Sequence, residues 1–234
     1  MPTPRRRGFE ALTRGLAAAL LLALGGGCSN GDSATYLGDN DPAVVVALGD
    51  SITVGAHDMD TEICDESRGG ELGFCPRLQG LTGKTVVNEG NCGENSTGGL
   101  FRIDDVLERW RPGVILIDYS PNDVRNGVDA AIENLRAMIT IARENKTVPI
   151  LGTLVPAVGR HRTWAPFIEA LNPRILELCA KEGVPCADHY QAFISDPRYI
   201  EDPYALLADD GLHPNSNGYT VMAETWRGPL MGAY

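Results

Sequence analysis

The chain has 234 residues, of which 43% are hydrophobic and 22% charged, so it can form one domain with a hydrophobic core but not two large ones. These proportions exclude a disordered chain, a collagen and a coiled coil. The formal net charge of −11 argues against a nucleic-acid partner, because phosphate backbones attract basic surfaces.

The amino terminus has the features of a bacterial export signal. A basic, arginine-rich start precedes an apolar run from Gly15 to Leu24, which is too short to span a bilayer and suits a signal peptide. We therefore expect residues 1–27 to be a signal peptide and the protein to be exported, by the general or the twin-arginine route. Three glycines before Cys28 resemble a lipoprotein processing site, at which Cys28 would be lipidated and would anchor the protein in the membrane. The alternative is ordinary cleavage with Cys28 incidental.

A polar segment over residues 28–42 predicts a flexible tether, and residues 43–234 predict a single domain. Short apolar runs rich in β-branched residues predict five strands buried on both faces, at residues 43–48, 84–87, 114–118, 148–154 and 184–188. Apolar residues three and four apart predict four helices, at about residues 100–110, 131–142, 168–179 and 217–231. This alternation is typical of an α/β fold with a mostly parallel sheet covered on both faces. In such sheets, ligands bind beyond the carboxyl ends of the strands.

The cysteines predict disulfide bonds and one unpaired thiol, because five of them follow Cys28 in an exported chain. Cys179 and Cys186 lie seven residues apart across a predicted helix-to-strand turn, so they are the favoured pair. Cys64 and Cys75 are the candidates for a second bridge, which would stiffen a polar rim or lid over residues 57–73. Cys92 competes for either partner.

Polar and small residues follow three of the predicted strands. Ser51 follows the first strand within a Gly-Asp-Ser-Ile-Thr segment, where the start of a helix would favour a developing anion. Gly90 and Gly93 follow the second strand and would let backbone amides approach a substrate. Asn122 follows the third strand and offers a neutral amide donor. Taken singly, each of these residues is more often a helix cap or part of a turn.

A carboxylate and an imidazole precede the last predicted helix. Asp210 lies three residues before His213, so the carboxylate can hold one ring nitrogen and leave the other free to accept the proton of Ser51. The chain therefore offers a nucleophile, a base, an orienting acid and donors for an oxyanion at one edge of the predicted sheet.

Together these motifs resemble the SGNH hydrolases, also called GDSL-type esterases and lipases, over about residues 43–230. The resemblance implies a three-layer α/β/α flavodoxin-like sandwich. It also implies catalytic roles for Ser51, Asp210 and His213, and an oxyanion hole formed by Ser51, Gly93 and Asn122, with Gly90 as the alternative to Gly93. Family members often carry Asp after the second-motif glycine, where this chain has Glu94.

The function expected from the resemblance is that of a serine ester hydrolase that forms an acyl-enzyme and needs no cofactor or metal. Its substrate would be a small-molecule, lipid or carbohydrate ester, with a mild preference for a short-chain or carbohydrate ester. One alternative is a non-catalytic binding lipoprotein on the same fold. Another is a metal-dependent hydrolase whose ligands would be the carboxylates of Asp209 and Asp210 and the imidazoles of His189 and His213.

Overall fold

A computed structural model describes residues 37–58, 64, 71–119 and 121–233 of the chain. The predicted signal peptide, Cys28 and most of the predicted tether lie outside these residues, as do residues 59–63 and 65–70 of the predicted rim. The first strand begins at Asp41, so the end of the predicted tether is part of the sheet.

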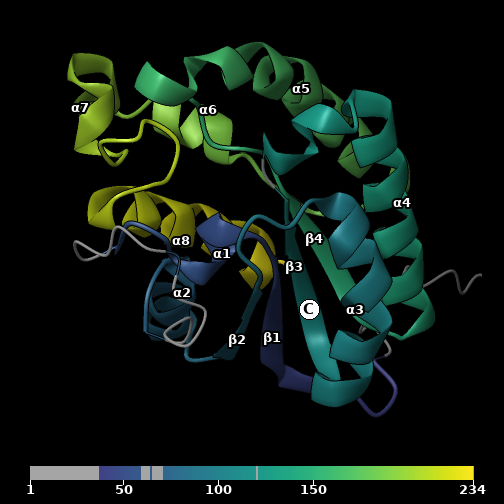
Figure 1. Ribbon diagram of the computed structural model, residues 1–234. Coiled ribbons are helices and arrows are strands. Elements are labelled where there is room, and N and C mark those ends of the chain that lie inside the picture. The colour runs from purple at the N-terminus through teal and green to yellow at the C-terminus, as the bar shows by residue number, and fades with distance from the viewer. Residues whose placement is uncertain (1–36, 59–63, 65–70, 120, 234) are drawn as a thin grey trace, which may run out of the picture. The chain divides into compact units, whose positions relative to one another are not determined.

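The sheet has five strands, and every neighbouring pair is parallel (Figure 1). The strands are β1 (Asp41–Gly49), β2 (Thr85–Gly90), β3 (Pro112–Asp118), β4 (Val148–Gly152) and β5 (Cys186–Ala187). Their spatial order is β2-β1-β3-β4-β5, which is the flavodoxin-like order. The predicted parallel α/β/α sandwich is confirmed, although the fifth strand is shorter than the predicted one.

Eight α-helices lie among the described residues. They are α1 (Ser51–Val54), α2 (Phe74–Thr82), α3 (Ser96–Trp110), α4 (Val128–Glu144), α5 (Ala165–Glu182), α6 (His189–Ile194), α7 (Pro197–Glu201) and α8 (Ser216–Met231). Three 3₁₀ helices, η3 (Pro121–Arg125), η4 (Gly159–Trp164) and η5 (Pro203–Ala205), interrupt the loops between them. The sequence predicted α3, α4, α5 and α8, but not α2, α6 or α7. No helix of the described residues has the length and apolar character that a membrane span requires.

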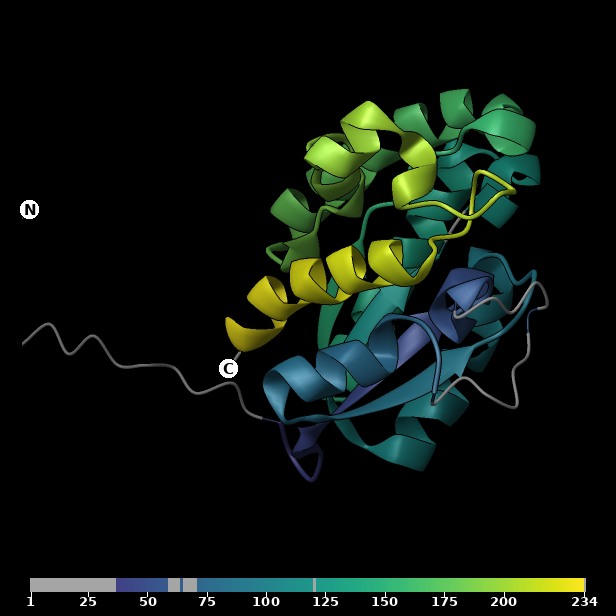
Figure 2. The same ribbon diagram turned by 90° about the vertical axis from the view of Figure 1, so that its left-hand side faces the viewer.

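Two hydrophobic layers cover the sheet, because side chains alternate between the faces of a strand. Val46 and Leu48 of β1 pack with α3, α4 and α5 on one face. Val45 and Ala47 pack with α2, α6 and α8 on the other face. Figure 2 shows α8 in yellow and α2 in blue-green side by side over this second face. Burying each large aliphatic side chain contributes about 1.5–3 kcal/mol, so the two layers hold the strand ends in fixed positions.

The disulfide bonds correct one of the predictions. Cys64 is bonded to Cys92, which lies in the loop after β2, so the predicted bridge between Cys64 and Cys75 is wrong. The physical reason is that Cys75 is buried in α2 within the second hydrophobic layer, where burial raises the pKa of its thiol. The bond between Cys179 and Cys186, the pair favoured by spacing, joins the end of α5 to β5.

Candidate active site

Ser51 lies at the first residue of α1, directly after β1. Asp50 caps this helix, because its side chain accepts a hydrogen bond of 2.9 Å from the amide of Ile52. The turn is tight: a Cβ atom at Gly49 would lie 2.3 Å from the carbonyl oxygen of Asp118 on β3. Glycine therefore lets the helix begin at the end of the strand and presents Ser51 beyond the carboxyl edge of the sheet.

Ser51, His213 and Asp210 form a continuous chain of hydrogen bonds. The Ser51 Oγ lies 2.9 Å from the Nε2 of His213. The Nδ1 of His213 lies 2.6 Å from the Oδ2 of Asp210. Ser51 lies 162 residues before His213 in the sequence, and the fold brings the hydroxyl of α1 against the loop that precedes α8.

Two backbone amides hold the carboxylate of Asp210 in position beside His213. Its Oδ1 accepts hydrogen bonds from the amides of Leu212 and His213, at 3.0 and 3.1 Å. Burial alone would raise the pKa of Asp210, but the hydrogen bonds from His213 and Leu212 outweigh it and hold the pKa below its usual range. Asp210 is therefore a carboxylate at neutral pH, and a carboxylate can orient the ring and stabilise its charged form.

Two further imidazoles lie beside Asp210. The ring of His57 is stacked on that of His213, with ring centroids 4.9 Å apart, and its Nε2 is 3.8 Å from the Oδ2 of Asp210. His57 has a φ of +65°, a conformation that non-glycine residues rarely adopt. The Nδ1 of His161 lies 2.8 Å from the carbonyl oxygen of Asp210. Neither histidine belongs to a motif, so sequence reasoning assigned them only to loops.

Three of these residues could hold a metal ion. His57, Asp210 and His213 offer ligand atoms within 4.8 Å of one another, which is the one such group among the described residues. The alternative metal set that the sequence suggested is not brought together. Asp209 is exposed, whereas His189 is fully buried against the ring of Trp226.

The expected oxyanion donors lie in loops that adjoin the ends of the strands, and the amide of Asn91, two residues before Gly93, donates to the carbonyl oxygen of Gly49 at 3.0 Å. Gly93 adopts a φ of +74°, and within the described part of the chain neither its amide nor that of Ser51 donates a hydrogen bond. The amide of Gly90 already donates to the side chain of Asn88 at 2.9 Å, so Gly93 is the better candidate. The Nδ2 of Asn122 donates to the Oδ2 of Asp50 at 3.1 Å, which places Asn122 beside the residue that precedes Ser51.

Two buried carboxylates lie beside the start of α1. Asp50 and Asp118 are both buried, and Asp118 contacts the hydroxyl of Thr53 at 3.4 Å. Burial, together with the negative charge of Asp50, raises the pKa of Asp118 to about 8, although the hydrogen bond from Thr53 opposes this. Asp118 is thus largely protonated at neutral pH.

A parallel sheet in this strand order, with a hydrogen-bonded Ser–His–Asp set beyond its carboxyl edge, is the architecture of an SGNH-type hydrolase. The chain belongs to the GDSL-like Lipase/Acylhydrolase family, which it matches over residues 47–221.

Individual relatives are distant. A multidomain esterase from Ruminococcus flavefaciens is 26% identical over 162 residues, which cover 65% of this chain and 20% of the relative. An arylesterase from Vibrio mimicus is 22% identical over 142 residues, which cover 60% of this chain and 66% of the relative. The crystal structure of a lipase/acylhydrolase from Enterococcus faecalis superimposes with a TM-score of 0.66 at 27% identity, covering 81% of this chain and 95% of that one. The chain thus spans a fifth of the first curated relative and just under two thirds of the second.

Proposed function

We propose that the protein is a serine ester hydrolase in which Ser51 is the nucleophile, His213 the general base and Asp210 the residue that orients His213. The observation that carries this proposal is the unbroken series of contacts from Ser51 Oγ to His213 Nε2, at 2.9 Å, and from His213 Nδ1 to Asp210 Oδ2, at 2.6 Å. Both distances lie within the range of a hydrogen bond that can carry a proton.

The reaction has two steps. The Ser51 oxygen attacks the ester carbonyl carbon while His213 Nε2 takes the hydroxyl proton, and the tetrahedral intermediate then expels the alcohol, which receives that proton. Water attacks the resulting acyl-serine, again with His213 as base, and releases the carboxylic acid. The amides of Ser51 and Gly93 would stabilise the oxyanion. The side-chain amide of Asn122 would join them by releasing one of its present acceptors, the carboxylate of Asp50 or the carbonyl of Glu94. Removal of one such donor typically raises the barrier by about 3–4 kcal/mol.

Replacement of the nucleophile tests this proposal. We expect Ser51→Ala to lose nearly all hydrolysis of p-nitrophenyl acetate, because members of a triad act as a unit. The wild type should also be inactivated by a serine-reactive phosphonate, with the adduct on Ser51 by mass spectrometry. Ser195→Ala is the matched control, since Ser195 lies at the end of α6 and contacts Gln191. If Ser51→Ala keeps most of the activity, the assignment fails.

A metal-dependent hydrolase is the second candidate, because His57, Asp210 and His213 offer close ligand atoms. It predicts loss of activity with a strong chelator and recovery on adding back Zn²⁺ or Mn²⁺. The serine mechanism instead predicts full activity in the chelator. A protein that binds esters without turning them over, on the same fold, would show no difference between the wild type and Ser51→Ala.

For the substrate we propose a short-chain or carbohydrate ester. Two curated relatives are a multidomain esterase and an arylesterase, which supports small ester substrates. A series of p-nitrophenyl esters of increasing acyl length, together with acetylated xylan, would decide between short and long acyl groups by the acid released.

We also propose that the protein is exported, which its disulfide bonds support, and that Cys28 is its lipid anchor. Incorporation of labelled palmitate into the wild type but not into Cys28→Ser would test the anchor.

A further inference from the structure

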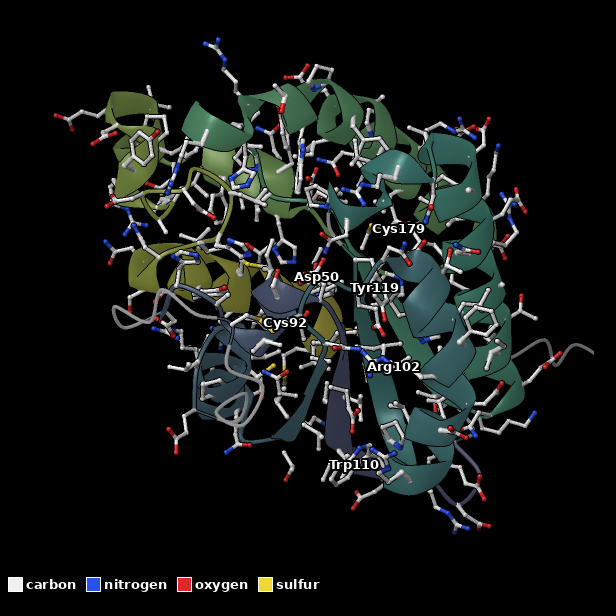
Figure 3. The ribbon with its side chains drawn as sticks, in the orientation of Figure 1. Asp50, Cys92, Arg102, Trp110, Tyr119 and Cys179 are labelled. Carbon is white, nitrogen blue, oxygen red and sulfur yellow. A yellow bond between two sulfur atoms is a disulfide. The ribbon has the colours of Figure 1, made fainter. Side chains whose placement is uncertain are left out.

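Glu94, which directly follows Gly93, is held by three side chains. The Nε of Arg102 lies 3.0 and 2.8 Å from its two carboxylate oxygens, and the hydroxyl of Tyr119 donates to Oε2 at 2.9 Å. The side-chain Nδ2 of Asn91 donates to Oε1 at 3.0 Å. The side chain of Glu94 is only 8% exposed, so this carboxylate depends on these partners. Figure 3 labels Arg102 and Tyr119, which lie between α3 and the sheet.

Arg102 also binds the main chain at the ends of two strands. Its Nη2 donates to the carbonyl oxygen of Glu89 on β2 at 2.6 Å and to that of Gly49 on β1 at 3.2 Å. These carbonyls stand just before the loops that carry Gly93 and Ser51. One guanidinium thus ties both loops to α3, which a planar group with five donors can do and an ammonium cannot.

Two glycines of α3 make room for this arrangement. A Cβ atom at Gly98 would lie 2.7 Å from the Cγ of Glu94, and one at Gly99 would lie 1.8 Å from the hydroxyl of Tyr119. Glutamate is one methylene longer than the aspartate often found at this position in the family. The side chains of Arg102 and Tyr119 and the two glycines therefore fit the longer side chain of Glu94. We call this set the Glu94 clamp (Glu94, Gly98, Gly99, Arg102 and Tyr119).

The clamp supports two of the expected oxyanion donors. The amide of Glu94 donates to the carbonyl of Asn91 at 3.1 Å and closes the turn that contains Gly93. The carbonyl of Glu94 accepts a hydrogen bond of 3.0 Å from the Nδ2 of Asn122. A shift of Glu94 would therefore move the Gly93 amide and the Asn122 side chain together.

We propose that Arg102 and Glu94 are positioning residues that set the geometry of the oxyanion hole, an inference that rests on the proposed serine hydrolase function. Neither residue needs to touch the substrate. Their contribution arises because donors aimed at a developing charge lose much of their effect when displaced by about 1 Å.

The test compares Arg102→Gln, Glu94→Gln and Tyr119→Phe with Arg109→Gln. Arg109 is the matched control, because it lies on the same helix and binds Glu89 at 3.2 Å without contacting Glu94. With p-nitrophenyl acetate we expect kcat to fall about 10–100-fold for the Arg102 and Glu94 variants, with KM nearly unchanged. Tyr119→Phe should show a smaller fall, and Arg109→Gln none.

Binding of an aryl boronic acid provides a readout that a structural role alone would not change. Its tetrahedral adduct with the serine resembles the transition state, so its Ki should rise in proportion to the fall in kcat/KM across the series. The Glu94→Gln/Arg102→Gln double variant should lose little more than either single variant, because the two side chains act as one unit. Circular dichroism and thermal melting establish which variants fold, and Tyr119→Phe, which removes a single hydroxyl, is included for the case in which Arg102→Gln does not.

The outcomes separate the two proposals. If the folded clamp variants have a lower melting temperature but wild-type kcat and boronic acid Ki, the clamp is purely structural and this inference is wrong. Activity retained in Ser51→Ala would instead overturn the serine hydrolase itself. Loss of activity in Ser51→Ala together with fully active clamp variants overturns only the clamp.

Discussion

Two buried carboxylates beside the start of α1, those of Asp50 and Asp118, take no part in the proposed mechanism. Asp50 caps α1 and binds Asn122, so its negative charge has partners. The carboxylate of Asp118 is buried, and its one hydrogen-bond partner among the described residues is the hydroxyl of Thr53, at 3.4 Å. Of two neighbouring buried carboxylates, the one with fewer donors holds the proton, because two like charges in a low dielectric repel strongly.

This proton makes stability depend on pH, and Asp118→Asn should remove the dependence. The pKa of Asp118 is about 8 in the folded protein, whereas its ordinary value, which applies to the unfolded chain, is 3.8. Between these two pH values the folded state binds a proton that the unfolded state does not. Stability therefore falls as pH rises, by at most about 1.4 kcal/mol per pH unit, and levels off above pH 8. Urea midpoints at pH 6.5, 7.5 and 8.5 should fall for the wild type relative to Asp118→Asn. Parallel pH curves for the two proteins would show that Asp118 is ionised in the fold.

At the level of elements, the proposed active site consists mainly of loops that follow strands, and contacts from outside the sheet hold these loops. The bond between Cys64 and Cys92 ties the chain after α1 to the loop that carries Gly93. The bond between Cys179 and Cys186 joins the end of α5 to β5, and neither cysteine belongs to a loop that carries a proposed site residue. Removing each bridge in turn therefore distinguishes an effect on the loop that carries Gly93 from an effect on overall stability alone.

We expect Cys64→Ser/Cys92→Ser to lower both stability and kcat. A bridge with a sequence separation of 28 stabilises by about 3–4 kcal/mol in the chain-entropy account, and the loop with Gly93 loses its covalent anchor. Cys179→Ser/Cys186→Ser, with a separation of 7, should lower stability by about 2 kcal/mol and leave kcat unchanged. Thermal melts and steady-state kinetics of both pairs check this. Equal kcat in the two variants would mean that the Gly93 loop does not need its bridge.

The elements also show how far sequence patterns reach. The long helices were predictable because burial of one face imposes a period on the side chains. The strands β1 and β3 were predictable because burial on both faces produces a continuous apolar run. The helices α2, α6 and α7 are short, and their contacts come from distant residues, so no local period marks them. The contact of Arg102 with Glu94 and the pairing of Cys64 with Cys92 depend on which loops the sheet brings together. Ser51, Asn122 and His213 could be proposed because each lies in a recognisable motif.

At the scale of the whole molecule, the layer between the sheet and α8 contains a buried imidazole, that of His189. His189 is fully buried, and within the described residues neither of its ring nitrogens has a hydrogen-bond partner. Its ring packs edge-on against Trp226, at a centroid distance of 4.7 Å. Burial lowers the pKa of His189 to about 3, so the folded state holds it neutral.

His189 and Asp118 should therefore have opposite effects on stability as the pH falls, and the variant His189→Phe should show the effect of Asp118 alone. Between pH 6.5 and about 3 the unfolded state binds a proton at His189 that the folded state does not, so His189 lowers stability as pH falls. Asp118 raises stability over the same fall, because there only the folded state binds its proton. The wild type should then have a nearly flat urea midpoint between pH 4.5 and 6.5. His189→Phe, which keeps a ring against Trp226, should become more stable as pH falls through this range, and Asp118→Asn less stable. Three parallel curves would mean that one or both groups are not held in the ionisation states that their burial implies.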